Sequence, residues 1–348
     1  MKKKKLVYSI LGFLLAVLAT LATMIMEPEP VAPSGDLTIH FIDVGQADCA
    51  LLECGGEYMI IDGGNIDDGQ LVISYLQQQG VEELAAVVCS HAHEDHVGGL
   101  PSVLAVFPTK AVYAPTKTYS SKVFDDFLYY TDQQRLEVTI PAPGDRIPFG
   151  DVSIQVLGPV QSYADPNDTS IILRIDHGES SFLFTGDMEV AAENDMLDHW
   201  NNDALFDVDV LKMGHHGSDT STGYRFLNAV MPEYSVISVG QDNSYGHPHK
   251  EPMARLKQAG VVALRTDHLG HIIATSDGTQ IAFTWENQNA QPEDVEPAGP
   301  ITFIGNSNSK TLHSQDCSSL PAEDKRTYFD SYKEAIEAGY TPHERCLG

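Results

Sequence analysis

Basic residues are scarce in this sequence. Its 348 residues include 21 Lys and Arg but 49 Asp and Glu, so the formal net charge is −28. An acidic surface of this kind repels polyanions at long range and disfavours non-specific adsorption to nucleic acid. Divalent cations bound at a site would reverse the sign of the charge locally. The charge therefore argues against a DNA-coating protein, but it does not exclude a nuclease.

Cysteine is also rare, and the five residues form an odd number. Cys49, Cys54 and Cys89 lie in apolar or strand-like stretches, where an unpaired thiol usually behaves as a small buried side chain. We therefore expect these three to belong to the core. Cys317 and Cys346 lie in a separate C-terminal module and call for a different interpretation.

Long apolar stretches are lacking except at the N-terminus, where Leu6–Met26 follows four consecutive lysines. This pattern predicts a signal sequence or a single membrane span. The basic flank keeps the short tail cytoplasmic and directs the rest of the chain outward. Ala22 and Met24 make a poor cleavage site, which favours an uncleaved anchor over secretion after cleavage. We therefore expect an extracytoplasmic protein that contacts the membrane through residues 1–26.

The remaining sequence divides into a spacer, a large domain, a linker and a small module. Residues 27–35 form a proline-rich spacer, and residues 286–300 form a polar linker that also contains proline. Between them, residues 36–285 show strands that first pair as hairpins and later alternate with helices, in two similar passes. This order predicts the α/β class, with two sheets packed face to face and helices outside, an αββα sandwich. Residues 301–348 form the small C-terminal module.

A cluster of metal-binding side chains follows the apolar run Leu84–Ser90, with His91, His93, Asp95 and His96 inside six residues. If the chain stays extended after the run, the first two histidines project to the same side and can share one cation. A turn would then swing the other two side chains toward a second position. Imidazole and carboxylate suit zinc, manganese or iron, and a paired site activates water for hydrolysis. A polar loop of solvated histidines is the plainer alternative.

An aspartate ends a second apolar strand. Asp187 follows Ser181–Thr185, and Gly186 releases the chain at the sheet edge, so the carboxylate can reach between two cations. The alternative role is to cap the helix predicted over residues 188–199. Asp62 comes at the end of another strand, where a carboxylate can fix the orientation of ligating histidines.

Two adjacent histidines, His215 and His216, follow the strand predicted at residues 208–212. Gly217 would let a substrate approach closely, so one of them can donate a proton to a leaving group or stabilise the transition state. The alternative is a hydrogen-bonded core histidine. The sequence does not distinguish which of the two faces the site.

Together, six segments in this order resemble the metallo-β-lactamase superfamily, and more narrowly its ComEC-type competence-protein branch: Phe41–Asp48, Ile60–Gly64, His91–His96, Phe184–Asp187, Lys212–Ser218 and Asn243–Pro248. The resemblance covers about residues 36–285. It implies a hydrolase with the αββα fold of that superfamily and two divalent cations, zinc or manganese. It also places His247 as a ligand of the second cation, beside Asp95 and His96.

The sequence departs from many superfamily members in one respect. They place a third histidine for the first cation about 20 residues before the strand-end aspartate, whereas Asp165–Ser170 contains none, as in the ComEC-like branch. Asp168 or Asn167 can fill that position, or a water can. More oxygen ligands would let manganese compete with zinc. We expect His177 to be a hairpin residue rather than a ligand.

The C-terminal module contains His313, Cys317, His343 and Cys346, a set that can hold a structural zinc tetrahedrally. A module of this size needs such a cross-link. Its sequence is similar to small Ada-like zinc-binding modules appended to bacterial nucleases, except that His343 replaces the first cysteine of their final pair. A Cys317–Cys346 disulfide and two free thiols are the alternatives.

We therefore expect an extracytoplasmic dinuclear-metal hydrolase that cleaves phosphodiesters, with DNA or nucleotides as substrates. Asp187 would bridge the cations, Asp95 would orient the attacking water, and His215 or His216 would assist the leaving oxygen. The same centre could hydrolyse another ester, an amide or a lactone, because the fold does not fix the substrate. A third hypothesis is an anchored, non-catalytic component of a DNA-uptake or envelope complex. No protein partner follows from the sequence.

Overall fold

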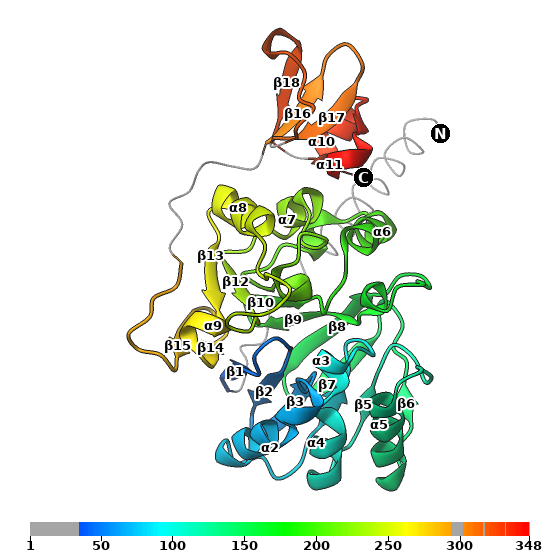
Figure 1. The fold of residues 1–348 in the computed structure, drawn as a ribbon, viewed down its shortest axis with the longest axis vertical. Coiled ribbons are helices and arrows are strands. Elements are labelled where there is room, and N and C mark those ends of the chain that lie inside the picture. The colour runs from blue at the N-terminus through cyan, green and yellow to red at the C-terminus, as the bar shows by residue number, and fades with distance from the viewer. Residues whose placement is uncertain (1–34, 294–301, 316, 331, 348) are drawn as a thin grey trace, which may run out of the picture.

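The computed structural model describes residues 35–293, 302–315, 317–330 and 332–347 (Figure 1). The predicted N-terminal segment 1–26, the spacer except for Gly35, and residues 294–300 of the linker lie outside these ranges. Within the described ranges, no helix combines the length and the apolar character needed to cross a bilayer.

Two sheets lie face to face at the centre of the large domain. The first has the strand order β15-β14-β1-β2-β3-β4-β5-β6 and the second the order β13-β12-β11-β10-β9-β8-β7. The strands of the first sheet are β1 Leu37–Phe41, β2 Ala50–Cys54, β3 Glu57–Ile61, β4 Ala86–Val88, β5 Val112–Tyr113, β6 Val138–Thr139, β14 Ile272–Ser276 and β15 Ile281–Trp285. Those of the second are β7 Arg146–Phe149, β8 Val152–Gly158, β9 Ile172–His177, β10 Ser180–Phe184, β11 Val210–Lys212, β12 Tyr234–Ile237 and β13 Val262–Arg265.

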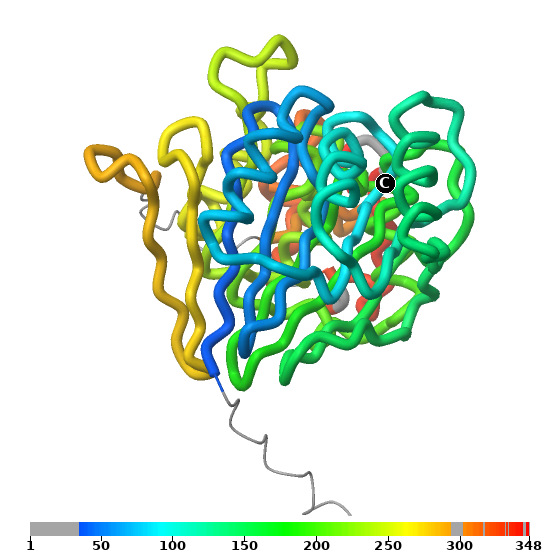
Figure 2. Tube along the Cα trace, turned by 90° about the horizontal axis from the view of Figure 1, so that it is seen from below, coloured from blue at the N-terminus to red at the C-terminus, as the bar shows by residue number. Residues whose placement is uncertain are grey.

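Helices cover the outer face of each sheet, as Figure 1 shows and Figure 2 shows from below. The first sheet is covered by α2, α4 and α5, and the second by α6, α7 and α8. The helices of the large domain are α2 Gly69–Gln78, α3 Glu94–Val97, α4 Leu100–Val106, α5 Lys122–Gln133, α6 Val190–Trp200, α7 Tyr224–Val230, α8 Lys250–Ala259 and α9 Thr266–Leu269. The predicted αββα sandwich is confirmed.

Apolar side chains from both sheets form the central core, among them Phe41, Phe149, Phe182 and Leu264. The rings of Phe41 and Phe184, one from each sheet, stack with their centroids 5.7 Å apart. A second cluster lies under α2, α4 and α5, and a third under α6 and α7. Burial on both faces explains why the central strands are almost continuously apolar.

Parallel pairing brings the ends of several strands to one edge of the sandwich. β3 pairs with β4, with Ile61 opposite Val88, while β10, β11 and β12 are parallel neighbours in the other sheet. The carboxyl ends of parallel strands meet at a common edge, where α/β proteins usually bind their ligands. The predicted site residues His91, Asp187 and His215 follow the ends of β4, β10 and β11, respectively.

The C-terminal module has its own sheet, in the order β18-β16-β17-β19, and two short helices. Its elements are β16 Phe303–Asn306, β17 Thr311–Ser314, β18 Arg326–Phe329, α10 Tyr332–Glu337, β19 Thr341–Pro342 and α11 Glu344–Leu347. The module packs on α7 and α8 (Figure 1). The Arg225 guanidinium lies 4.5 Å from the ring centroid of Tyr332, and Gln315 donates to Gln258.

Candidate metal centre

Two histidine nitrogens and a carboxylate mark a first ligand position. His91 and His93 follow β4, and their Nε2 and Nδ1 atoms lie 3.1 Å apart. Two ligands of one tetrahedral zinc lie about 3.3 Å apart. Asp187 Oδ2 lies 3.8 Å from His91 Nε2. The chain bends here instead of staying extended as expected, but the two imidazoles still converge.

A second group of ligand atoms shares the same aspartate. Asp95, His96, Asp187 and His216 each offer an atom within 4.8 Å of the others. His96 Nε2 lies 3.2 Å from Asp187 Oδ1, and His216 Nε2 lies 3.3 Å from Asp95 Oδ2. Asp187 therefore faces both groups of ligand atoms.

Buried polar atoms without hydrogen-bond partners indicate whether a cation fits between these ligand atoms. His96 Nε2, His216 Nε2 and Asp187 Oδ1 are buried and have no hydrogen-bond partner. Buried polar atoms without partners are costly and rare in folded proteins. Three of them converging on one point match the ligand set of a divalent cation with nitrogen and oxygen preference. The residues present fit a metal ion.

Hydrogen bonds behind the histidines fix their orientation. Asp62 Oδ2 accepts from His96 Nδ1–H at 2.9 Å and from the Ser90 hydroxyl at 2.7 Å. Ser90 Oγ in turn lies 3.2 Å from His91 Nδ1. These contacts leave the Nε2 atoms of both histidines free to face a cation. Asp62 lies behind the ligating histidines, where the sequence predicted it.

His216, and not His247, joins the second group of ligand atoms. Its Nδ1–H donates to the Ser238 carbonyl at 3.0 Å, so its Nε2 lone pair faces Asp95 and Asp187. The sequence left open which of His215 and His216 is catalytic, and the resemblance placed His247 as a ligand. In the structure, His216 is one of the residues whose ligand atoms converge, and His247 is not among them.

His247 is held by a different partner. Gln46 Oε1 accepts from the Gly240 N–H at 3.1 Å, which turns the Gln46 amide nitrogen toward His247 Nδ1 at 3.3 Å. Because His247 Nδ1 accepts, its proton resides on Nε2. Burial and the neighbouring His216 lower the pKa of His247 to about 4. His247 is therefore a neutral hydrogen-bond donor at physiological pH.

His215 lies at the rim of the centre. Its Nδ1 is 3.3 Å from Glu189 Oε1 and 3.2 Å from the Thr220 hydroxyl, and its Nε2 is 3.8 Å from Asp187 Oδ2. His216 is buried, whereas His215 keeps 22% of its side chain exposed. Of the two adjacent histidines, His215 is thus the one that a substrate can reach.

The backbone around these histidines is strained. His215 and His216 have φ values of 48° and 52°, in the left-handed region that non-glycine residues avoid. A Cβ on Gly217 would approach Pro248 Cβ to 2.6 Å, so only glycine lets the two loops meet. Such conformations persist where surrounding contacts enforce them, and they concentrate at functional sites.

Asp168 is not among the converging ligand atoms. Its Oδ1 accepts from the Glu189 N–H at 3.0 Å, which places it at the start of α6. The same segment instead supplies Ser170, whose hydroxyl accepts from the Asp187 N–H at 3.0 Å. Asn167 reaches Glu189, 3.4 Å away. As expected, His177 is no ligand: it bonds to the Ser276 hydroxyl and the Gly35 carbonyl.

The buried charges are coupled to one another. Burial alone would lower the pKa of His96, but the carboxylates of Asp187 and Asp62 raise it well above its usual range. Burial would raise the pKa of Asp187, but His96 and His216 hold it well below. A proton on His96 and a divalent cation would stabilise the same carboxylates, so the two would compete for this place.

The C-terminal module holds a separate set of ligand atoms in His313, Cys317, His343 and Cys346, all within 4.8 Å of one another. Neighbouring nitrogen–sulfur distances are 3.4, 3.6 and 3.4 Å. A tetrahedral zinc with these ligands requires about 3.6 Å. Cys317 and Cys346 are free thiols in the structure, not a disulfide. The cluster therefore fits zinc.

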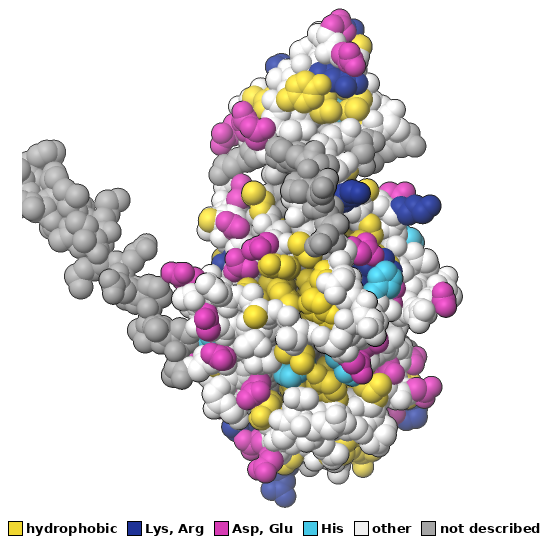
Figure 3. All heavy atoms as spheres, turned by 90° about the vertical axis from the view of Figure 1, so that its left-hand side faces the viewer, with side chains coloured by type: hydrophobic (Ala, Val, Ile, Leu, Met, Phe, Trp, Pro, Cys, Tyr) yellow, Lys and Arg dark blue, Asp and Glu magenta, His cyan; other side chains and the backbone are white. Residues whose placement is uncertain are grey.

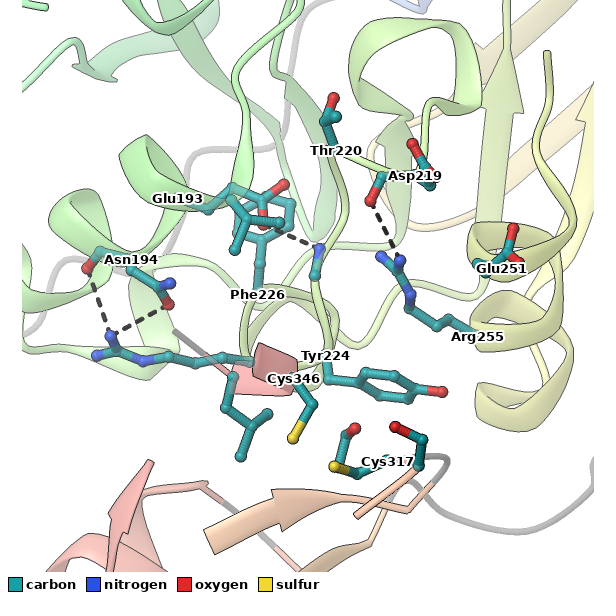
Figure 4. A pocket seen from close by; sticks show the side chains of 16 residues that line it. Glu193, Asn194, Asp219, Thr220, Tyr224, Phe226, Glu251, Arg255, Cys317 and Cys346 are labelled. Carbon is teal, nitrogen blue, oxygen red and sulfur yellow. Dashed lines mark hydrogen bonds between the residues drawn. The ribbon is translucent and has the colours of Figure 1, made fainter. Parts of the chain in front are cut away.

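A cavity of about 830 Å³ is lined by Cys317 and Cys346 of this cluster and by residues of the large domain (Figure 4). Arg255 lines it and donates to the carbonyls of Ser221 and Thr222, while Glu193 accepts from the N–H groups of Thr222 and Gly223. Both side chains thus hold the loop that follows His216. Neither residue was predicted from the sequence, and nor were Gln46, Glu189, Ser170 and Ser238, because their partners are distant in the sequence.

The large domain is similar in sequence to proteins of a known family. Residues 42–241 match the profile of the metallo-beta-lactamase superfamily. ComE operon protein 3 of Bacillus subtilis (strain 168) is 28% identical over 258 residues, which are 69% of this chain and 33% of that protein. Competence protein ComA of Neisseria gonorrhoeae is 30% identical over 257 residues, 73% of this chain and 34% of that protein. The chain thus spans about a third of the length of these relatives.

Solved structures with a similar fold share less sequence identity with this chain. The metallo-beta-lactamase fold protein YhfI from Bacillus subtilis is 13% identical with a TM-score of 0.47, covering 72% of this chain and all of that one. The expected relation to competence proteins is confirmed by the relatives' names, and the metal centre has the ligand types of a metal-dependent hydrolase. The chain belongs to the metallo-beta-lactamase superfamily.

Proposed function

We propose that this protein is a phosphodiesterase that works outside the cytoplasm with two divalent cations, zinc or manganese. The observation that carries the proposal is the position of Asp187, whose Oδ2 lies near His91 and His216 and whose Oδ1 lies near His96. A carboxylate shared by two groups of ligand atoms suits a dinuclear centre. Such a centre supplies Lewis acidity to a phosphoryl oxygen and to an attacking water.

The surrounding residues have separate tasks in this proposal. Asp95 keeps 31% of its side chain exposed and can accept a hydrogen bond from the attacking water, which orients it. The His247 Nε2–H donates to a phosphoryl oxygen that gains charge in the transition state. His215, paired with Glu189 at the rim, gives a proton to the leaving oxygen.

The expected location of the protein and its net charge narrow the class of substrate that we propose. The basic and apolar N-terminal segment supports a membrane-anchored protein outside the cytoplasm. Acidic side chains are spread over the surface in Figure 3, and the net charge of −28 disfavours tracking along a long polyanion. The competence and recombination names of the relatives favour nucleic acid or its fragments as the substrate class.

A metal-supplemented assay tests the proposal. The full chain in detergent, with Zn²⁺ or Mn²⁺, is given bis-p-nitrophenyl phosphate, single-stranded DNA and a lactone, with Asp187→Asn as the control. We expect phosphodiester hydrolysis by the parent and at least 10³-fold less by the variant. Faster hydrolysis of the lactone would assign the centre to other esters. Bound metal without activity on any substrate would indicate the non-catalytic role.

A further inference from the structure

The loop between β12 and α8 is rigidly built and stands beside the metal centre. In Figure 2 this segment, coloured yellow-green, projects at the upper edge beyond its neighbours. The Asn243 side chain lies at its middle and makes four hydrogen bonds: it donates to the carbonyls of Gly240 and His247 and accepts from the N–H groups of Tyr245 and His247.

His249 connects the tip of this loop to the segment that follows His215 and His216. His249 Nδ1 accepts from the Asp219 N–H at 3.0 Å, so the proton of this imidazole resides on Nε2. That Nε2 then donates to the Tyr245 carbonyl at 3.2 Å. The backbone of Tyr245 is therefore fixed from both sides before any ligand arrives.

Three rings rise in a stack from the metal centre to the surface. His216 and His247 are stacked with centroids 6.4 Å apart and planes inclined by 24°. Tyr245 stacks on His247 at 5.6 Å, also with an inclination of 24°. His216 is buried at the centre, whereas Tyr245 keeps 67% of its surface exposed. The outer face of the Tyr245 ring is thus open to a further planar group.

We propose that Tyr245 is a stacking platform for a nucleobase next to the scissile phosphodiester. The inference rests on the proposed function and narrows its substrate to nucleotides with an unpaired base. Stacking suits this protein because it needs no basic groove, and the chain has few basic residues. A base inside a duplex offers no free face, so single strands and short fragments are the expected substrates.

The tyrosine on the other side of the centre is arranged differently. Tyr119 meets His93 edge-on, with centroids 6.2 Å apart and planes at 68°. Its ring also packs against Phe124 at 6.0 Å, within the apolar cluster under the first sheet. Tyr119 therefore serves the core, and the proposal concerns Tyr245 alone.

The inference is tested by steady-state kinetics of the full chain, loaded with Mn²⁺, on one substrate that carries nucleobases and one that lacks them. The substrates are dithymidine monophosphate and its analogue with abasic sugars, followed by chromatography of the products. We expect Tyr245→Ala to raise KM for the dithymidine substrate about tenfold, with kcat and the abasic substrate unchanged. Tyr245→Phe should keep the parent KM. Tyr328→Ala, which removes a tyrosine 60% exposed in the C-terminal module, is the matched control.

Two outcomes would overturn the stacking platform alone: a KM for the dithymidine substrate within twofold of the parent, or an equal rise for both substrates. Either can occur while bis-p-nitrophenyl phosphate is still hydrolysed, so it leaves the proposed function intact. If the parent hydrolyses no phosphodiester, the proposed function fails separately. Equilibrium dialysis with labelled dithymidine monophosphate then decides: equal binding by parent and Tyr245→Ala would also reject the platform.

Discussion

The Lys212 ammonium lies 2.8 Å from the Asp48 carboxylate, and both side chains are buried beneath the metal centre. Lys212 ends β11 in the second sheet, whereas Asp48 precedes β2 in the first. The other Asp48 oxygen lies 3.5 Å from His216 Nδ1. The ion pair therefore joins the two sheets directly behind a ligand of the proposed cations.

Replacing Lys212 by Met should destabilise the protein strongly. The substitution leaves the Asp48 charge buried without its partner, and breaking one side of a buried pair typically costs about 3–5 kcal/mol. Denaturant unfolding followed by circular dichroism measures the loss. Lys110→Met is the matched control, because Lys110 pairs with Glu83 at the exposed surface, where solvent screens the pair and its loss should change stability little. Similar losses for the two variants would contradict the role given to the buried pair.

Much of the fold and the ligand types could be predicted from local sequence. The αββα class follows from the order of apolar strands and helices, and Asp187 is recognisable because it comes three residues after the end of an apolar strand, Ser180–Phe184. The helix α5 was not predicted, although Val123, Phe124 and Phe127 form its buried face, because exposed acids and polar residues interrupt the pattern.

The roles of single histidines could not be read from the sequence. Whether an imidazole ligates or donates depends on which nitrogen is bonded, and the deciding partners are distant: Ser238 for His216, and Gln46 for His247. The same holds for the bend after β4. Asp62 accepts the Ser90 N–H at 2.7 Å, which turns the chain away from the extended course that the strand pattern predicts.

Removing one ligand should empty the metal centre without touching the C-terminal cluster. His91→Ala deletes a ligand of the position shared with His93, so metal bound at this centre and hydrolytic activity should both fall by at least tenfold. The four residues of the C-terminal cluster should keep the zinc that we expect them to bind. Elemental analysis of parent and variant measures both at once. Equal metal contents would count against the assignment of His91, and loss of all zinc would indicate general unfolding.

The ligand role given to His216 and the donor role proposed for His247 can be separated experimentally. His216→Ala should lose one cation per chain, because its Nε2 faces Asp95 and Asp187. His247→Ala should keep the parent's metal content and lose about 10²–10³-fold in kcat, as expected for a lost transition-state donor. Metal titration followed by steady-state kinetics compares the two variants. Loss of a cation from His247→Ala with full retention in His216→Ala would restore the ligand role to His247.

Acid should destabilise the protein partly through His40, which lies away from the metal centre. Its Nδ1 meets the Tyr75 hydroxyl at 2.9 Å, while its Nε2 is buried without a hydrogen-bond partner. Burial, together with His271, lowers the pKa of His40 from 6.5 to about 4. Because the folded pKa is the lower one, the unfolded chain binds the proton first as the pH falls.

The contribution of His40 to stability is therefore fully present above pH 6.5 and declines until the pH reaches about 4. The loss across this window amounts to about 3 kcal/mol. His40→Asn offers a side chain that can still bond to Tyr75 but does not titrate, so its free energy of unfolding should depend less steeply on pH. Urea unfolding at pH 7.0, 5.5 and 4.5 measures both slopes. If parent and variant lose stability in parallel, His40 is not a source of the acid sensitivity.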